Sequence, residues 1–137
     1  MTAKEYLSRY RLLSAQIAAK QERIDVLKLR AQSVSSPSFS GVKTTSPKGE
    51  SKHENLTDYC AALEDELFEK KIRLTYLQRE IEHAIAKVPD DKQRTVLELR
   101  YLNCLPFSKI AERLHYSPEN VYTIHRDALK NITVHYS

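Results

Sequence analysis

The hydrophobic residues of the N-terminal segment recur at alternating steps of four and three positions. The series runs from Tyr6 to Ala31, and Lys20 fills the polar position within it. Its apolar members are Tyr6, Tyr10, Leu13, Ile17, Ile24, Leu27 and Ala31. Such steps place side chains along one face of an α-helix, as in a coiled coil. The pattern therefore predicts a long helix with one buried face.

A second series of the same kind follows between Cys60 and Val88, with Lys70 in its polar gap. Its apolar members are Cys60, Leu63, Leu67, Leu74, Leu77, Ile81, then Ala84 or Ile85, and Val88. Pro89 should end this helix, because proline cannot continue a helix interior. Residues 33–55, between the two series, are rich in Ser, Thr, Lys and Pro, and we expect a flexible loop there.

The two predicted helices carry opposite charge. Residues 1–32 hold seven basic and three acidic side chains, whereas residues 56–88 hold five basic and seven acidic ones. Opposite charge favours pairing of the two helices with each other, and the loop is long enough for an antiparallel hairpin. Pairing between chains remains an alternative.

A specific register follows if the numbers of facing residues sum to about 90. Leu27 then faces Leu63, and Lys20 lies near Lys70. Two neighbouring lysines need a carboxylate close by, and Glu66 or Glu69 could supply it.

The last third of the chain shows a helix-turn-helix pattern between Pro89 and Ile132. Its apolar positions are Phe107, Ile110, Ala111 and Leu114, and then Val121, Ile124 and Ala128. They form one stripe on each of two short helices. Ser117 should cap free backbone N–H groups at the start of the second helix. Pro118 suits the first helical position, because it has no N–H to satisfy. A three-residue joint of this kind lets the second helix enter a DNA major groove.

Two residues of this pattern have particular backbone roles. Ala111 is small and lies where two steeply crossing helices would touch. His115 occupies the turn, and histidine tolerates the left-handed conformation better than most residues other than glycine.

The segment Pro89 to Ile132 resembles region four of bacterial sigma factors, the domain that reads the −35 promoter element and docks on RNA polymerase. The resemblance rests on Val96-Leu97-Glu98-Leu99-Arg100-Tyr101 and on Lys109-Ile110-Ala111-Glu112-Arg113-Leu114. The layout of a long coiled segment before a lone region-four module is similar to small regulators of unknown function in Firmicute phages and prophages.

A helix of this kind reads base edges with its N-terminal residues, so Glu119, Asn120 and Thr123 are the candidate readers. The phosphate contacts are expected from Tyr122, Arg126 and Lys130, and from the preceding helix. The complete candidate DNA-binding set is Ser108, Lys109, Arg113, Ser117, Glu119, Asn120, Tyr122, Thr123, Arg126 and Lys130.

Composition argues against several other classes of protein. The formal net charge is +4, which is compatible with nucleic acid. Cys60 and Cys104 form no CxxC pair, so two reduced thiols are expected and no metal or cofactor. The five histidines show no catalytic spacing, and no Gly-rich phosphate loop occurs, so the protein is not expected to be an enzyme. Without a long apolar run we expect no membrane span and a location in the bacterial host cytoplasm.

These patterns predict an all-α fold with two parts: a helical hairpin over residues 1–88 and a DNA-binding domain over residues 89–137. The second part carries seven basic and six acidic side chains, so one module alone should bind phosphate weakly. We therefore expect a transcriptional regulator of phage or prophage genes that binds double-stranded DNA as a homo-oligomer, with a dimer favoured. The alternatives are a protein that docks on RNA polymerase without reading DNA, and a DNA-packaging component similar to a small terminase subunit.

Overall fold

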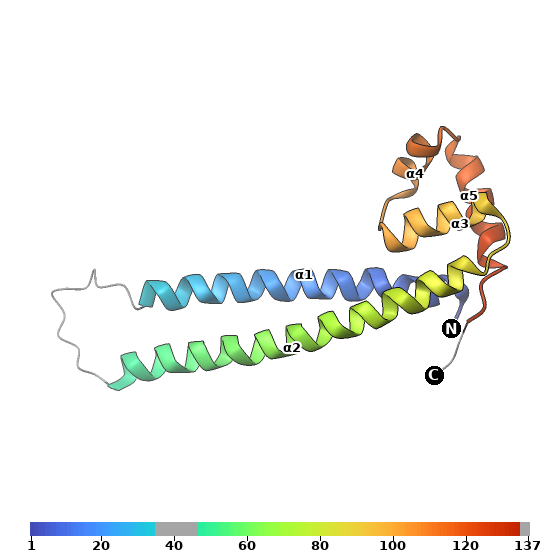
Figure 1. Ribbon diagram of the computed structural model, residues 1–137. Coiled ribbons are helices and arrows are strands. Elements are labelled where there is room, and N and C mark those ends of the chain that lie inside the picture. Colours follow the sequence, from blue (N-terminus) through green and yellow to red (C-terminus); the bar gives the residue numbers. More distant parts are fainter. Residues whose placement is uncertain (35–46, 135–137) are drawn as a thin grey trace. The chain divides into compact units, whose positions relative to one another are not determined.

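The computed structural model describes the backbone of residues 1–34 and 47–134, and the side chains of residues 1–32 and 55–134. All regular elements in these ranges are helices, which confirms the predicted all-α class (Figure 1). They are α1 (Ala3–Val34), α2 (Pro47–Ala86), α3 (Asp91–Leu97), the π-helix η1 (Glu98–Leu102), α4 (Phe107–Leu114) and α5 (Pro118–Leu129). The chain divides into two compact units, one of residues Ala15–Ile72 and one of Met1–Ser14 with Arg73–Ser137.

Both long helices extend into residues 33–55, where the sequence predicted a loop. Helix α1 continues to Val34, and α2 already begins at Pro47. Proline is well placed in a first helical turn, because its missing N–H would have no helical partner there. The remaining part of the expected loop, residues 35–46, lies outside the described residues. At its other end α2 stops at Ala86, three residues before Pro89, as proline requires.

In the unit Ala15–Ile72, α1 and α2 run antiparallel and bury the predicted apolar series between them. Ile24, Leu63 and Leu67 form the core, and Ile17 and Leu27 pack against it. Two ion pairs fix the register: Lys20 with Glu66, and Lys28 Nζ with Glu64 Oε1 at 2.7 Å. Both agree with residue numbers that sum to about 90.

Lys20 is the polar residue within the first series, and the structure shows how the helix tolerates it. Its side chain is 15% exposed and its ammonium group meets the carboxylate of Glu66. Lys20 and, more weakly, Lys70 lower the pKa of the Glu66 carboxyl. Glu66 thus supplies the negative charge that the sequence required beside the two lysines.

In the other unit, residues 3–14 of α1 lie against residues 73–86 of α2. Arg9 Nη2 lies 3.1 Å from Glu80 Oε1, and the Tyr6 hydroxyl donates to the same oxygen at 2.8 Å. The Arg9 guanidinium also stacks on the Tyr6 ring, 4.4 Å from its centroid. Burial and the bond to Glu80 raise the pKa of Tyr6 to about 12. The apolar residues buried in this part are Tyr6, Leu7, Leu13, Leu77, Ile81, Ala84, Ile85 and Val88.

The helix-turn-helix domain follows α2 and has its own core. Val96 from α3, Ile110 and Ala111 from α4, and Val121 from α5 are buried together. Six partly buried residues close this core: Leu99, Leu105, Phe107, Leu114, Tyr116 and Ile124. No helix in the described part of the chain is long and apolar enough to cross a membrane.

Candidate nucleic-acid interface

Helix α5 starts where the sequence predicts it. The Ser117 hydroxyl accepts a hydrogen bond from the Asn120 N–H at 3.1 Å, and Pro118 is the first helical residue. The cap satisfies one of the four N–H groups that lack a helical acceptor, and proline removes another. The start of α5, where the candidate base readers lie, is therefore fixed in place.

The turn before α5 has the left-handed residue expected at His115. Its φ and ψ are 59° and 38°, and the following Tyr116 N–H donates to the Ala111 carbonyl at 3.0 Å. This bond satisfies a carbonyl at the end of α4 and turns the chain sharply. Ala111, only 4% exposed, belongs to the same buried cluster as Val121 of α5. The small side chain therefore lies at the contact of the two helices, as predicted.

The two faces of α5 differ sharply. Val121, His125 and Ala128 are buried on one face. At 100° per residue, Glu119, Thr123, Arg126 and Lys130 fall on the opposite face, and all four are exposed. Asn120 and Tyr122 flank that face and are also exposed. The exposed face is polar and carries carboxylate, amide and hydroxyl side chains together with cationic ones.

The candidate residues of α4 and the turn are exposed as well. These are Ser108, Lys109, Arg113 and Ser117. The structure therefore leaves all ten predicted contact residues accessible to a partner. Tyr122 also packs its ring against Phe107 of α4, with 4.9 Å between the centroids. That contact connects the exposed face of α5 to α4.

Several of these cations already have acidic neighbours. Arg126 Nε and Lys130 Nζ lie 3.4 Å and 3.8 Å from the Asp127 carboxylate, and Lys109 Nζ lies 3.6 Å from Glu112. Exposed pairs of this kind contribute at most about 1 kcal/mol, so a phosphate can replace the carboxylate at small cost. For Arg113 the described residues include no ion-pair partner.

Tyr101, Phe107 and His125 form an aromatic cluster on the inner face of α5. The Tyr101 oxygen lies 2.7 Å from Nε2 of His125, and the Phe107 ring meets the His125 ring edge-on at 4.9 Å. The Arg100 guanidinium stacks over the Phe107 ring, 4.3 Å from its centroid, and donates to the Leu105 carbonyl at 3.1 Å. Residues of η1, α4 and α5 are thereby held in one packed cluster.

His125 is uncharged in this cluster near neutral pH. Burial lowers its pKa from 6.5 to about 4, and the nearby charges of Arg100 and Lys4 act in the same direction. Burial also raises the pKa of Tyr101, so its hydroxyl keeps its proton. We assign Tyr101 as donor and His125 Nε2 as acceptor, because the phenolic proton then has a buried partner.

The sequence analysis did not identify this cluster. His125 lies at the same helical spacing as Val121 and Ala128, so its position on the buried face could have been recognised from the sequence. The π-helix η1 gives no comparable signal. In its wide turn the Asn103 N–H donates to the Glu98 carbonyl at 3.0 Å. This turn places Tyr101 in the core and Arg100 beside Phe107.

Together these features define a helix-turn-helix domain with an exposed second helix. Residues 85–133 match the family model of sigma-70 region 4, a DNA-binding helix-turn-helix domain. The match covers the C-terminal part of the chain and confirms the resemblance seen in the sequence. No curated protein and no solved structure matches the chain. The described residues contain no group of three or more His, Cys, Asp or Glu side chains placed to hold a metal ion.

Proposed function

We propose that this protein is a sequence-specific DNA-binding regulator of transcription, acting on phage or prophage genes. The observation that carries the proposal is the capped helix α5 with its exposed polar face. Glu119, Asn120 and Thr123 lie near its N-terminal end, which is the part of a recognition helix that meets base edges. The positive end of the helix dipole also lies there, so a nearby phosphate is stabilised.

Asn120 is the strongest candidate for base recognition. Its backbone N–H is bound to Ser117, which fixes its position, while its side chain is exposed. An asparagine amide can form two hydrogen bonds with adenine in the major groove. Thr123 differs, because its hydroxyl donates to the Glu119 carbonyl at 3.1 Å. With its hydroxyl bound there, the threonine methyl is the group proposed to contact a thymine methyl.

Asn120→Ala tests this assignment, with Asn103→Ala as a matched exposed asparagine outside α5. Both proteins are titrated against a duplex recovered by binding selection and against a random duplex. Asn120→Ala should weaken the selected duplex by about 1–3 kcal/mol and leave the random duplex unchanged. Asn103→Ala should match the wild type on both. Equal affinity of Asn120→Ala and wild type for the selected duplex would reject the role of Asn120.

RNA polymerase is the alternative partner, because sigma-70 region 4 domains are suited to that contact as well as to DNA. In this case polymerase would be captured without DNA, and none of the α5 substitutions would alter duplex binding. The two functions are separated by measuring polymerase capture and DNA titration on the same variants.

A further inference from the structure

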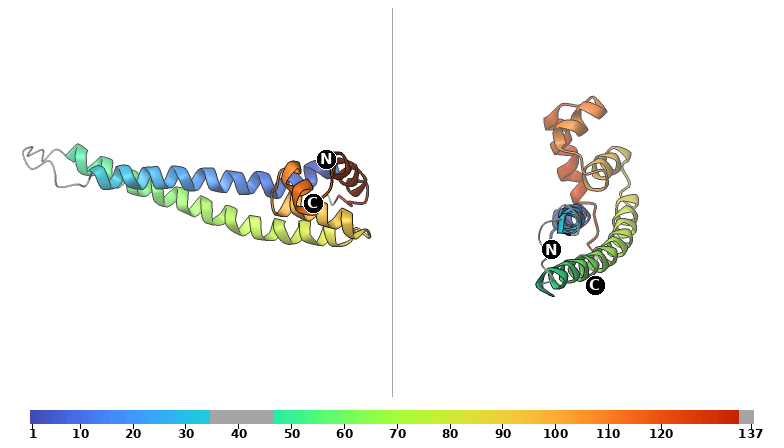
Figure 2. Two further views of the ribbon diagram at one scale, coloured as in Figure 1. Left: turned by 90° about the horizontal axis from the view of Figure 1, so that it is seen from above. Right: turned by 90° about the vertical axis from the view of Figure 1, so that its left-hand side faces the viewer.

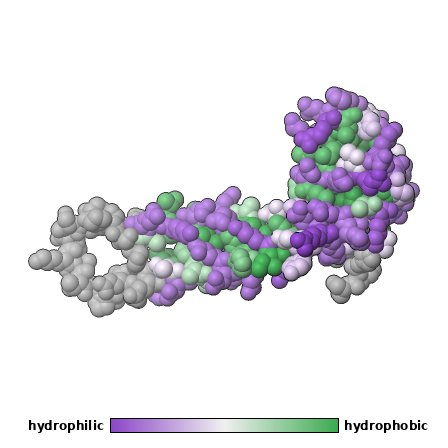
Figure 3. All heavy atoms as spheres, viewed as in Figure 1, coloured by the Kyte–Doolittle hydropathy of each residue, from purple (hydrophilic) through white to green (hydrophobic). Residues whose placement is uncertain are grey.

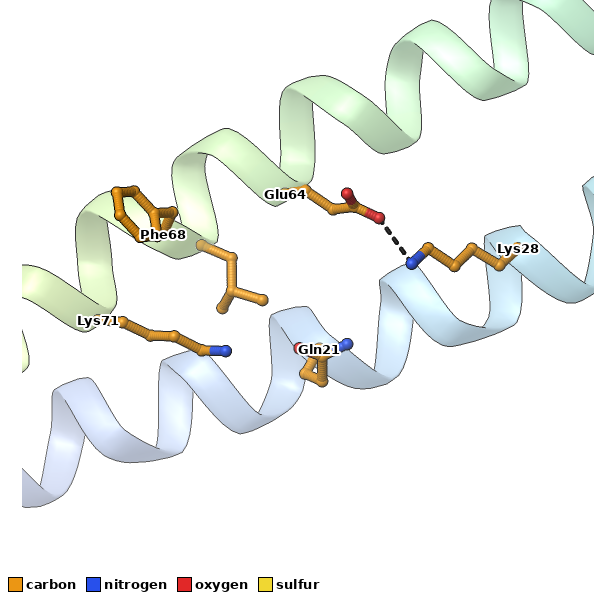
Figure 4. Close-up of a pocket in the computed structure, with 6 residues that line it drawn as sticks. Gln21, Lys28, Glu64, Phe68 and Lys71 are labelled. Carbon is orange, nitrogen blue, oxygen red and sulfur yellow. Dashed lines mark ion pairs between the residues drawn. The ribbon is translucent and has the colours of Figure 1, made fainter.

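The hairpin has apolar residues on its outer surface as well as on its buried faces. On α1, Val26 is 48% exposed and Leu29 is 65% exposed; on α2, Phe68 is 65% and Ile72 is 44% exposed. Figure 3 shows hydrophobic atoms at the surface of the hairpin among hydrophilic ones. In Figure 4 the Phe68 ring points away from α1, and Phe68 lines a groove together with Gln21, Lys28, Glu64, Leu67 and Lys71.

On each helix the exposed apolar residues form a stripe. The α1 stripe is Ala15, Ala19, Val26 and Leu29, with steps of four, seven and three residues. The α2 stripe is Ala61, Phe68 and Ile72, with steps of seven and four residues. At 100° per residue, each stripe lies roughly opposite the side on which its own helix packs within the chain. One hairpin therefore presents two separate apolar stripes, one on each helix.

The two stripes are complementary in size. If α1 of one copy lies antiparallel to α2 of another, in a register close to the one that α1 and α2 use within the chain, facing residue numbers sum to about 88. Ala15 then faces Ile72, and Ala19 faces Phe68. Val26 correspondingly faces Ala61. Small residues of one stripe thus lie opposite large residues of the other, which allows close packing.

The charges beside the stripes agree with the same register. Arg23 and Arg30 border the α1 stripe, and Asp58 and Asp65 border the α2 stripe; all four are exposed. Among the described residues none of the four has an ion-pair partner. In the antiparallel register Arg23 comes opposite Asp65, and Arg30 comes opposite Asp58, on the same edge of the interface. Pairing α1 with α1 would instead place arginines against each other.

Because the two stripes are complementary in both size and charge, we propose that copies of this chain assemble side by side. The α1 stripe of each copy packs on the α2 stripe of the next. Such a contact joins two different surfaces, so it generates a closed ring or an extended row of copies and does not stop at two. The assembly would bring several helix-turn-helix modules together, and their combined binding would exceed that of one weakly basic module. This inference concerns the hairpin and does not depend on the proposed reading of DNA.

Charge reversal across the interface tests the proposal. Arg23→Glu alone and Asp65→Arg alone each place like charges at every interface, and each protein should sediment with the mass of one chain. Mixed in equal amounts, the two variants should recover the wild-type mass, because every contact between unlike copies then pairs opposite charges. Lys87→Glu, an exposed change outside both stripes, should leave the wild-type mass unaltered.

The mass is measured by sedimentation equilibrium over a series of concentrations, with circular dichroism to confirm that each variant stays helical. Wild-type protein should contain three or more copies. A wild-type monomer or strict dimer, or a mixture of the two variants that fails to assemble, would overturn the proposed interface. Phe68→Ser provides an uncharged check and should lower the mass in the same way. The titrations with the selected and the random duplex are measured separately, and they decide the proposed function whatever the mass proves to be.

Discussion

The Tyr101 oxygen lies 2.7 Å from Nε2 of His125, and both side chains are buried beneath the exposed face of α5. A protonated histidine has donors on both ring nitrogens, so protonation would remove the acceptor that Tyr101 uses. We therefore expect the packing of α5 against η1 to weaken in acid.

The first prediction is a loss of stability in acid that depends on His125. Its pKa is lowered from 6.5 to about 4 on folding, so the folded state binds this proton less tightly than the unfolded state. The contribution of neutral His125 to the free energy of unfolding is complete above pH 6.5. It decreases as the pH falls towards 4, by on the order of 1–3 kcal/mol. Urea unfolding at a series of pH values measures it. His125→Gln should remove this part of the pH dependence, while His83→Gln, an exposed change, should retain it. Equal pH slopes for wild type and His125→Gln would contradict the assignment.

The second prediction concerns the start of α5. Ser117→Ala removes the acceptor for the Asn120 N–H, so the free energy of unfolding should fall by about 1 kcal/mol. Ser108→Ala is the matched control, because Ser108 is exposed in the same motif and its side chain does not cap α4. Denaturant titration of both variants should separate them. If they lose the same stability, the Ser117 cap does not stabilise the domain.

The third prediction tests the lysine inside the hairpin. Glu66→Gln removes the carboxylate that Lys20 contacts and leaves the lysine largely buried without a negative partner. The melting temperature should therefore fall, because an unpaired buried charge is costly. Lys20→Leu removes the charge and extends the apolar series, so it should raise the melting temperature. Glu22→Gln, on the exposed side of α1, should change little. A stable Glu66→Gln protein would show that the ion pair is unimportant.

The helical hairpin could be predicted almost completely from sequence, because its main determinant is local. Alternating steps from Tyr6 to Ala31 define one buried face of α1, and the charges require that Lys20 find a carboxylate. The last residue of α1 and the first residue of α2 were predicted less well. The Ser-Pro pair that begins α5 also occurs at residues 46–47, yet the polar composition of the following residues suggested a loop.

Features that depend on packing between distant elements could not be predicted in the same way. Leu7 lies outside the regular series of α1 and is nevertheless fully buried. The π-helix η1 and the left-handed Cys104, with φ of 57°, follow from how α3, α4 and α5 fit together. The spacing of His125 indicates its place on the buried face of α5, but its hydrogen-bond partner Tyr101 lies on another element and could not be identified from spacing.

The fourth prediction concerns the phosphate contact proposed for Arg126. Arg126→Ala should weaken binding to selected and random duplexes alike, because phosphate contacts carry no direct sequence information. The slope of log affinity against log salt should become shallower by about 0.9. Arg79→Ala, an exposed arginine of α2, is the control and should keep the wild-type slope. A change limited to the selected duplex would instead make Arg126 a base reader.

The most direct measurement of the central claim is the affinity of wild-type protein for a selected duplex and for a scrambled duplex of the same composition. Both titrations are made at one salt concentration, because affinity for DNA depends strongly on salt. Sequence-specific regulators typically bind their site about 10³-fold or more tightly than other DNA, and the proposed reading of bases by α5 predicts a clear preference in this direction. Equal affinity for the two duplexes, or no binding to either, would contradict the proposal that α5 reads DNA sequence.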